Sequence, residues 1–282
     1  MYTLIVENEF GEQLELTNNK NYDVIEAFGL NPPKAVIDTV AVSGVDGTRF
    51  NSSQIGERNI VISLNIKSPI ETNRIALYKY FKVKHYIKVY YQNEHLNVFT
   101  EGYVESFENN LFSQLQQPQI SIICPNPFWK AIDDTDISFE TTSSLFEFPF
   151  SIPIDGIEFS TINRIATTYF NAGDVATGAI IKFHATTNQI LNPTFYNRTN
   201  QTYFGLNFDM HEGDVITINT NQGEKSVTLW RNGVTTNILS SRISGSTWLI
   251  FEPGENEISY TADLGQANLR VSLQSVQKFE GV

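Results

Sequence analysis

Side chains capable of acid–base or metal chemistry are sparse in this chain. The histidines number four: His85, His95, His184 and His211. Nucleophilic catalysis requires a base beside the nucleophile, and a zinc site requires ligands that one element brings together. No two histidines have such a spacing, and a single cysteine excludes a thiolate zinc site. His184 falls on the outer face of an alternating strand and His95 and His211 fall in turns, so we predict no catalytic residue, no metal ligand and no cofactor site.

Two acidic segments are the next candidates. Glu255 and Glu257 stand two apart, and an extended strand would place them about 6 to 7 Å apart on one face, within the range of paired glycosidase carboxylates. The preceding Pro253-Gly254 indicates an exposed turn, which favours solvated side chains and leaves a glycoside hydrolase as an alternative. The run Asp133-Asp134-Thr135-Asp136 lacks the glycine and distal glutamate of an EF-hand loop, which favours a solvated linker over a calcium site.

Aromatic residues are the remaining candidates, because exposed rings stack on sugars and anchor protein interfaces. The chain has 20 Phe, 12 Tyr and 3 Trp. Neighbouring strand residues point to opposite faces, so one ring of Tyr90-Tyr91 must lie in a second layer or at an interface. The same question arises for Phe128-Trp129 and for Phe146, Phe148 and Phe150. Core packing is the favoured interpretation, and a carbohydrate-binding protein is the alternative.

The composition predicts a two-domain protein rich in β-structure. The chain has 282 residues, and 29 Ile, 25 Thr and 27 Asn against 12 Ala favour strands and turns over helices. Its formal net charge is −12, with 11 basic against 14 acidic residues up to residue 130 and 8 against 17 after it. Neither part has the basic excess of a nucleic-acid-binding surface. We expect Cys124 to be a buried thiol, and we read neither a signal peptide nor a membrane span.

The first part reads as a mainly antiparallel sheet with one helix. Ile60, Ile62, Leu64 and Ile66 alternate as in a half-buried strand. Ser68-Pro69-Ile70-Glu71 predicts a capped helix from about 69 to 83, with Ser68 as the cap. The predicted core face of this helix consists of Ile75, Tyr78 and Phe81, with Leu77 beside them. Tyr86 to Tyr91 and Leu96 to Phe107 read as a hairpin, and Ala35 to Ser43 is a strand-like run before the turn signal Gly44-Val45-Asp46-Gly47.

The second part reads as a β-sandwich. Pro125 and Pro127 interrupt the strands, so we place the boundary there, with domains 1–130 and 131–282. Turn signals then recur at intervals of roughly 8 to 12 residues, as in sandwiches. Asn232-Gly233 is the strongest of them, because a type I′ hairpin turn needs positive φ at both central residues. Alternating apolar sets accompany the turns: Phe204, Leu206, Phe208 and Met210; Ile216 and Ile218; Val227 and Leu229; and Leu269, Val271 and Leu273.

Several segments together resemble the distal tail protein family of siphophages. In the first part these are residues 42–47, 58–64, the capped helix and 120–129. In the second part they are residues 171–174, 192–197, 213–220 and 252–258, in the order usual for that family. The resemblance covers nearly the whole chain. It implies a ring-forming N-terminal domain of β-sandwich-like type with one α-helix and a β-hairpin, followed by an outward-facing β-sandwich of jelly-roll or galectin-like type.

The resemblance also implies a function. Members of the family are structural, non-enzymatic hubs at the tip of a non-contractile tail, assembled in the host cytoplasm as part of the virion. Six copies close into a ring around a channel through which DNA passes. The ring joins the tail tube protein to the tail-associated lysin or fibre and, in some phages, to receptor-binding proteins. No cofactor and no membrane partner is expected, and carbohydrate binding by the sandwich remains the alternative.

Overall fold

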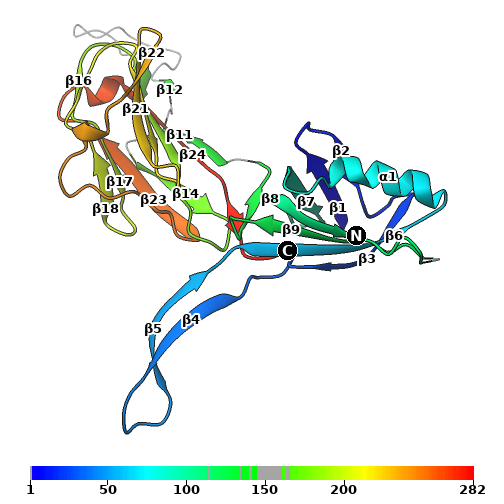
Figure 1. Ribbon diagram of the computed structural model, residues 1–282. Helices are drawn as coiled ribbons and strands as arrows, with labels where there is room; N and C mark the ends of the chain where they lie inside the picture. Colours follow the sequence, from blue (N-terminus) through cyan, green and yellow to red (C-terminus); the bar gives the residue numbers. More distant parts are fainter. Residues whose placement is uncertain (1, 114, 134, 140–141, 145–159, 163–165) are drawn as a thin grey trace, which may run out of the picture. The chain divides into compact units, whose positions relative to one another are not determined.

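The computed structural model describes residues 2–113, 115–133, 135–139, 142–144, 160–162 and 166–282. The chain divides into two compact units (Figure 1). Unit 1 comprises residues 1–132 together with 278–282, and unit 2 comprises residues 133–277. The last five residues therefore lie in the first unit, whereas the division at residue 130 assigns them to the second domain.

Unit 1 is built on a nine-stranded antiparallel sheet. Seven strands follow the order β2-β1-β7-β8-β9-β6-β3, and β10 pairs with both β8 and β25. The predicted hairpin is confirmed as β7–β8, and the alternating residues from Ile60 to Ile66 are buried in β6. The strands run over the following ranges: β1 Thr3–Asn8, β2 Gln13–Glu15, β3 Tyr22–Phe28, β6 Arg58–Ile66, β7 Tyr86–Gln92, β8 Asn97–Glu108, β9 Gln119–Cys124, β10 Trp129–Ala131 and β25 Lys278–Phe279.

The helix α1 spans Ile70–Tyr80 and packs against β1 and β6. The predicted cap at Ser68 is wrong, because the backbone is still extended at Pro69 and no side-chain cap hydrogen bond forms. The predicted core face is also shifted. Leu77 and Phe81 are buried, whereas Ile75 and Tyr78 are exposed. Since α1 contacts two strands separated by three others in the sheet, the sheet must curve around the core beneath it.

Unit 2 is a sandwich of two antiparallel sheets. One has the order β11-β24-β15-β20-β21-β22, and the other has the order β14-β23-β17-β18. Short pairs β12–β13 and β16–β19 accompany them. The strands run over the following ranges: β11 Thr135–Ser138, β12 Thr142–Ser144, β13 Ser160–Ile162, β14 Ala166–Asn171, β15 Ile180–Ala185, β16 Ile190–Leu191, β17 Thr194–Asn197, β18 Thr202–Gly205, β19 Asp209–Met210, β20 Val215–Asn219, β21 Ser226–Arg231, β22 Val234–Asn237, β23 Gly254–Thr261 and β24 Leu269–Ser275; two 3₁₀ helices cover Leu239–Ser241 and Gln266–Asn268.

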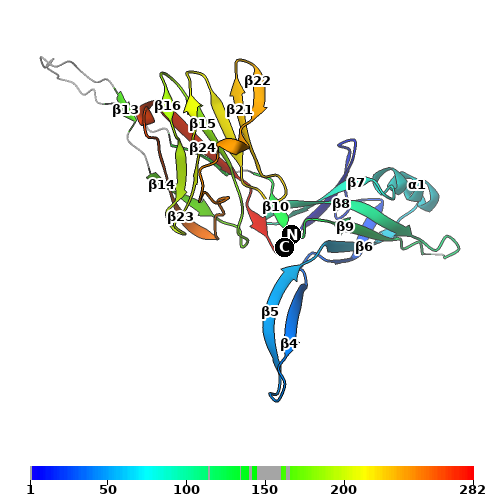
Figure 2. The ribbon, with the colours of Figure 1, turned by 60° about the vertical axis from the view of Figure 1, so that its left-hand side comes forward.

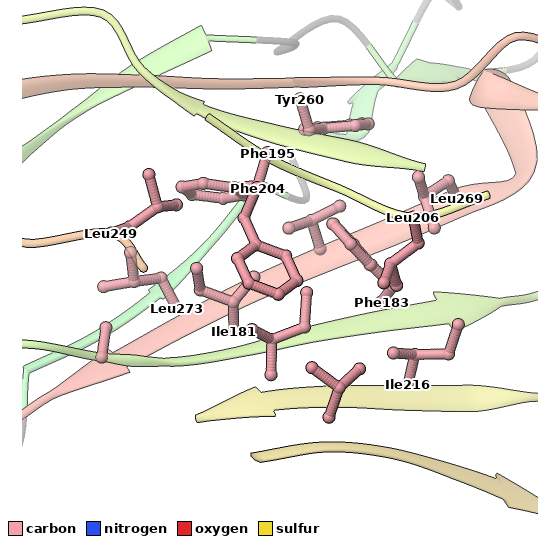
Figure 3. Close-up of a cluster of buried hydrophobic side chains, with 14 of the residues drawn as sticks. Ile181, Phe183, Phe195, Phe204, Leu206, Ile216, Leu249, Tyr260, Leu269 and Leu273 are labelled. Carbon is pink, nitrogen blue, oxygen red and sulfur yellow. The ribbon is translucent and has the colours of Figure 1, made fainter. Parts of the chain in front are cut away.

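One apolar core fills the space between these two sheets. Figure 3 shows Phe195 and Phe204 of one sheet together with Ile181 of the other in this core. The predicted alternating sets lie in this core, with Phe208 packed against its margin. The Asn232-Gly233 hairpin is confirmed, because β21 pairs with β22 and both turn residues have positive φ, 51° and 81°. Among the described residues, no helix is long and apolar enough to cross a membrane.

Candidate assembly interface

The β4–β5 hairpin is the most exposed regular element of unit 1. Strand β4 spans Ala35–Ala41 and β5 spans Thr48–Ile55, and the two pair only with each other. Figures 1 and 2 both show the hairpin extending away from β6. Every residue of β4 is exposed, and so is every residue of β5 except Ile55. The predicted strand-like run is therefore half of a hairpin, and the predicted turn Gly44-Val45-Asp46-Gly47 lies at its tip.

Both faces of the β4–β5 hairpin carry apolar side chains. The register pairs Ile37 with Ser53 and Thr39 with Phe50, which places Ile37 and Phe50 on one face. Val36 and Val40 lie on the opposite face. These side chains, with Val42 and Val45 near the tip, are 47 to 66% exposed. Consecutive apolar residues in a strand that buries neither face are unfavourable in water, so this hairpin is suited to being covered by another chain.

The root of the hairpin is held by one buried arginine. Arg58 begins β6, is 2% exposed, and lies with its guanidinium 5.5 Å from the ring centre of Trp129. It donates hydrogen bonds to the carbonyl oxygens of Gly29, Asn31, Pro127 and Glu280, at 2.8 Å for Asn31 and 2.6 Å for Pro127. Burial lowers the pKa of this guanidinium. A single cation thus joins the segment that enters the hairpin to two other parts of unit 1.

The C-terminal residues complete this root. Phe279 pairs with Trp129 in the β25–β10 ladder, and the amide of Val282 donates to the Leu30 carbonyl over 3.2 Å. The Trp129 indole donates to the same carbonyl, also over 3.2 Å. Gly29 has φ +78°, and a Cβ there would lie 2.0 Å from the Asn59 carbonyl oxygen, so only glycine fits. The direction in which the chain enters β4 is therefore fixed by packing.

The predicted chemical candidates do not come together. His85 lies 2.8 Å from a Glu9 carboxylate oxygen, His184 is exposed on β15, and His95 and His211 are exposed outside regular elements. Within the described ranges, no three His, Cys, Asp or Glu residues form a potential metal site. The absence of catalytic residues and cofactors stays a prediction. Cys124 is buried as expected, and desolvation raises the pKa of its thiol to about 11.

The acidic segments lie on strands. Glu255 and Glu257 are exposed residues of β23, so the predicted turn ends where that strand begins. Thr135 and Asp136 belong to β11 and pair with β24, which corrects the prediction of a linker at these two positions. Residue 134 lies outside the described residues. Neither segment provides an enclosed group of carboxylates among the residues described here.

The neighbouring aromatic residues Tyr90 and Tyr91 lie on opposite faces of their strand, as strand geometry requires. Tyr91 packs on Trp129, with ring centres 6.5 Å apart, and Trp129 is fully buried. Tyr90 lies on the opposite face, where its hydroxyl donates to Glu7 over 3.1 Å. Residues Phe146, Phe148 and Phe150 lie outside the described residues. Of the rings that the sequence suggested, Tyr91 and Trp129 thus belong to the core side of the sheet and Tyr90 to its other face. The β4–β5 hairpin, which was not among those candidates, exposes six large apolar side chains.

Two family models match the sequence. A model described as a phage tail protein RIFT-related domain matches residues 10–124. A model described as the C-terminal domain of a siphovirus-type tail component matches residues 172–274. No protein of curated function matches the sequence significantly. The two matches fall in unit 1 and unit 2, in the order expected from the sequence.

Solved structures similar to the whole chain come from phage tails. The Dit protein of phage SPP1, a paradigm of the hub adsorption apparatus in phages that infect Gram-positive bacteria, is 11% identical with a TM-score of 0.68 over 99% of both chains. A chain of the phage P2 baseplate in its activated conformation with calcium is also 11% identical, with a TM-score of 0.55 over 100% of both chains. At this identity the likeness establishes a shared fold.

Proposed function

The chain belongs to the distal tail protein family of siphophages, and from this premise we propose that it forms a homohexameric hub whose ring joins the tail tube to the tail-tip apparatus and lets DNA pass. As a member of this family it is a structural protein of the virion tail tip. The family assignment indicates a structural rather than an enzymatic role. In the proposed assembly, unit 1 forms the ring and unit 2 faces outward toward the tail-associated lysin, the fibre or receptor-binding proteins.

The exposed apolar β4–β5 hairpin is the observation that carries this proposal. An isolated two-stranded hairpin is marginally stable in water, and this one exposes apolar residues on both faces. Packing against a neighbouring subunit would bury Val36 and Val40 on one side and Ile37 and Phe50 on the other. The clamped root favours the same role, because a fixed entry direction reduces the conformational entropy lost when the hairpin docks.

The outer face of the nine-stranded sheet supports the passage of DNA. Its carboxylates lie beside lysines, with Glu101 2.5 Å from Lys130 and Glu7 3.8 Å from Lys88. Burial opposes ionisation of Glu101, but hydrogen bonds from Lys130 and Tyr86 outweigh it and lower the pKa of this carboxyl. Paired charges of this kind attract phosphate weakly, because the lysines are already neutralised. We assign this face to the channel wall of the proposed ring.

Light scattering coupled to size exclusion, with negative-stain electron microscopy, tests the ring. We expect hexameric rings from the full-length protein, alone or after addition of its tail tube protein. The double variant Val36→Asp/Val40→Asp should prevent ring formation, since each buried carboxylate would lose its hydration. Val234→Asp is the matched control, because Val234 in β22 is 61% exposed and Val36 is 59% exposed.

The possible outcomes test the hexameric ring and the hairpin contact independently. A monomer at every concentration, with and without the tube protein, would contradict the hexamer. If the double variant forms rings normally, the hexamer still stands, but the β4–β5 hairpin is not the contact between its subunits. Loss of rings in Val234→Asp as well would show that charge at any exposed valine is disruptive, and that result would remove the support for this particular surface.

A further inference from the structure

A groove on unit 1 lies between the end of helix α1 and the end of strand β8. It has a volume of about 520 Å³, and its apolar lining consists of Tyr78, Phe81, Val83, Phe107 and Leu111. The aromatic rings of Tyr78 and Phe107 meet edge to face, with their centres 5.0 Å apart. Tyr78, Val83 and Leu111 are 40 to 50% exposed. Apolar walls that face water around a space of this size are suited to receiving side chains of another segment.

Further exposed apolar side chains adjoin this groove. Ile75 lies one helical turn before Tyr78 and is 55% exposed, and Phe112 follows Leu111 and is fully exposed. Helical spacing predicts Ile75 and Tyr78 as core residues, yet unit 1 leaves this side of α1 in water. A covering segment would account both for the apolar side of α1 and for a phenyl group that its own chain does not cover.

The β4–β5 hairpin of the same copy lies too far from this groove to fill it. The root of the hairpin is at Arg58, where β6 begins. The groove begins level with Ile62, because Phe107 pairs with Ile120 and Ile120 pairs with Ile62, and it continues toward Leu111. At about 3.4 Å a residue, its near end is roughly 14 Å along the sheet from Arg58. Figures 1 and 2 both show the hairpin directed away from α1. A β4–β5 hairpin that fills this groove must therefore belong to a second copy.

The symmetry of a ring requires two different surfaces on each subunit. In a closed ring of more than two identical copies, every contact joins one surface of a subunit to a different surface of the next. The β4–β5 hairpin provides a projecting apolar surface, and β4 alone extends over about 20 Å, further than the roughly 10 Å between packed sheets. The groove beside α1 provides a recessed apolar surface on another part of unit 1. The two surfaces are therefore complementary in shape.

The charges of the two surfaces are complementary as well. The lysines and the acidic residue among the lining residues and their direct neighbours in sequence are Lys79, Lys82, Lys84 and Glu108. His85 in the lining is paired with Glu9 at 2.8 Å. From residue 35 to residue 55, the charged residues of the hairpin are Asp38, Asp46 and Arg49. Since Asp46 lies at the tip beside Val45, an acidic tip would enter a groove bordered by lysines.

We propose that this groove receives the β4–β5 hairpin of a neighbouring copy, with Val42 and Val45 of the tip against Tyr78 and Leu111. The inference rests on the proposed hexameric hub, and it names the surface by which each subunit holds the hairpin of the next. It assigns the exposed side of α1 and the loop after β8 to the subunit contact.

Cross-linking of introduced cysteines in the full-length protein tests this contact. Cys124 is buried and the pKa of its thiol is raised to about 11, so it reacts slowly with maleimides. The variant Val45→Cys/Leu111→Cys is treated with a short bis-maleimide, alone and with the tail tube protein, and the products are separated on a denaturing gel. We expect a ladder from dimer to hexamer, because thiols held side by side react at an effective concentration of about 1 mM.

Two controls define the geometry of the contact. Val45→Cys/Val234→Cys is the matched variant, because Val234 is 61% exposed and Leu111 is 50% exposed. It should give about tenfold less covalent product or even less, since its second thiol lies outside the groove. An equimolar mixture of the single variants Val45→Cys and Leu111→Cys should stop at the dimer, because each subunit then has one thiol for one neighbour.

Electron microscopy of the same samples distinguishes this contact from the hexamer itself. Rings without a ladder, in Val45→Cys/Leu111→Cys and also in Val40→Cys/Leu111→Cys, would overturn the groove contact and leave the hexamer standing. Dimers formed by Val45→Cys alone would also overturn it, because one tip would then lie against another. If no rings form with or without the tube protein, both the hexamer and the groove contact are contradicted.

Discussion

The hairpins β4–β5 and β21–β22 follow similar backbone rules in different surroundings. Both turn through glycines with positive φ, Gly44 and Gly47 in the first and Gly233 in the second. In β21 the side chains of Val227 and Leu229 are buried against the sandwich core, whereas β4 buries none of its residues. Similar turn chemistry therefore specifies a hairpin without specifying what covers it. Apolar residues without a core in their own chain indicate a surface that another chain covers.

An arginine is associated with each hairpin, and the two arginines bind different partners. Arg58 donates to four backbone carbonyls at the root of β4–β5. Arg231 at the turn end of β21 binds the Asp214 carboxylate, whose side chain is 2% exposed. The first cation helps to fix the entry of a hairpin whose two strands pair only with each other. The second adds to a hairpin that is already packed, so its removal should have the smaller effect.

Replacement of Arg58 by alanine should give the largest effect. The variant leaves four acceptors without their donor and a void beside Trp129, so we expect unit 1 to lose about 4 kcal/mol of unfolding free energy. Arg58→Lys should restore less than half of this loss, because lysine lacks the planar fork. Hydrogen exchange resolved by peptide provides the measurement. An equally large increase of amide exchange in unit 2 would contradict the role of Arg58 as a local clamp of unit 1.

Truncation of an apolar residue in each hairpin tests the comparison directly. Leu229→Ala should cost about 3 kcal/mol, because it opens a cavity in the sandwich core. Ile37→Ala should cost less than about 0.5 kcal/mol in the unassembled protein, because this side chain is exposed. Urea unfolding of the two variants at matched concentration measures the difference. Comparable losses would mean that β4–β5 is already covered within its own chain.

Substitution of Asp214 by asparagine should cost about 2 kcal/mol at neutral pH, because charge-assisted hydrogen bonds are lost. Burial opposes ionisation of Asp214, but hydrogen bonds from Arg231 and the His211 amide outweigh it and lower the pKa of this carboxyl. The stabilisation is therefore complete above the unfolded-state pKa of about 4 and is lost as the pH falls through the lower folded-state value.

Unfolding midpoints of wild type and Asp214→Asn, measured from pH 7 to pH 2, show whether the two curves converge in acid. A constant difference across this range would contradict the linkage. Arg231→Lys provides a control that retains the charge and loses the paired hydrogen bonds.

Glycine substitutions at the two tips should give the smallest effects. Gly233→Ala places a Cβ at φ +81° and should cost about 1 kcal/mol, because β21–β22 is part of the cooperative sandwich. Gly44→Ala has a similar φ of +79°, but the strained tip lies outside the core of unit 1. We expect no measurable change in the unfolding midpoint for Gly44→Ala. A drop as large as that of Gly233→Ala would show that the tip is coupled to the core.

Much of the fold could be predicted from local patterns. The alternation from Ile60 to Ile66 has period two because one strand face is buried, and Asn232-Gly233 predicts its turn because both residues tolerate positive φ. The helix start could not be placed correctly, since the extended backbone at Pro69 leaves Ser68 outside the helix. The buried side of the helix carries Leu77 and Phe81 instead of Ile75 and Tyr78, because packing against the sheet decides which side is buried.

The candidate interface was harder to predict from the sequence than the fold. Strand β5 is mostly polar and has no alternation of its own, so only its pairing with β4 makes it a strand. The adjacent apolar residues Val36 and Ile37 did indicate an interface, because they place apolar side chains on both faces of one strand. Arg58 gave no local signal, since its acceptors at Gly29 and Glu280 are distant in sequence.

The pairing of β10 with β25 bears on how this chain can be redesigned. Lys130 and Lys278 face each other across two antiparallel strands, so the chain leaves unit 1 and returns to it at neighbouring positions about 5 Å apart. A tight turn between these strands would close unit 1 after complete excision of the sandwich, with the C-terminal residues still in place. Unit 2 can thus be exchanged as one insert between these two strands without altering the sheet of unit 1.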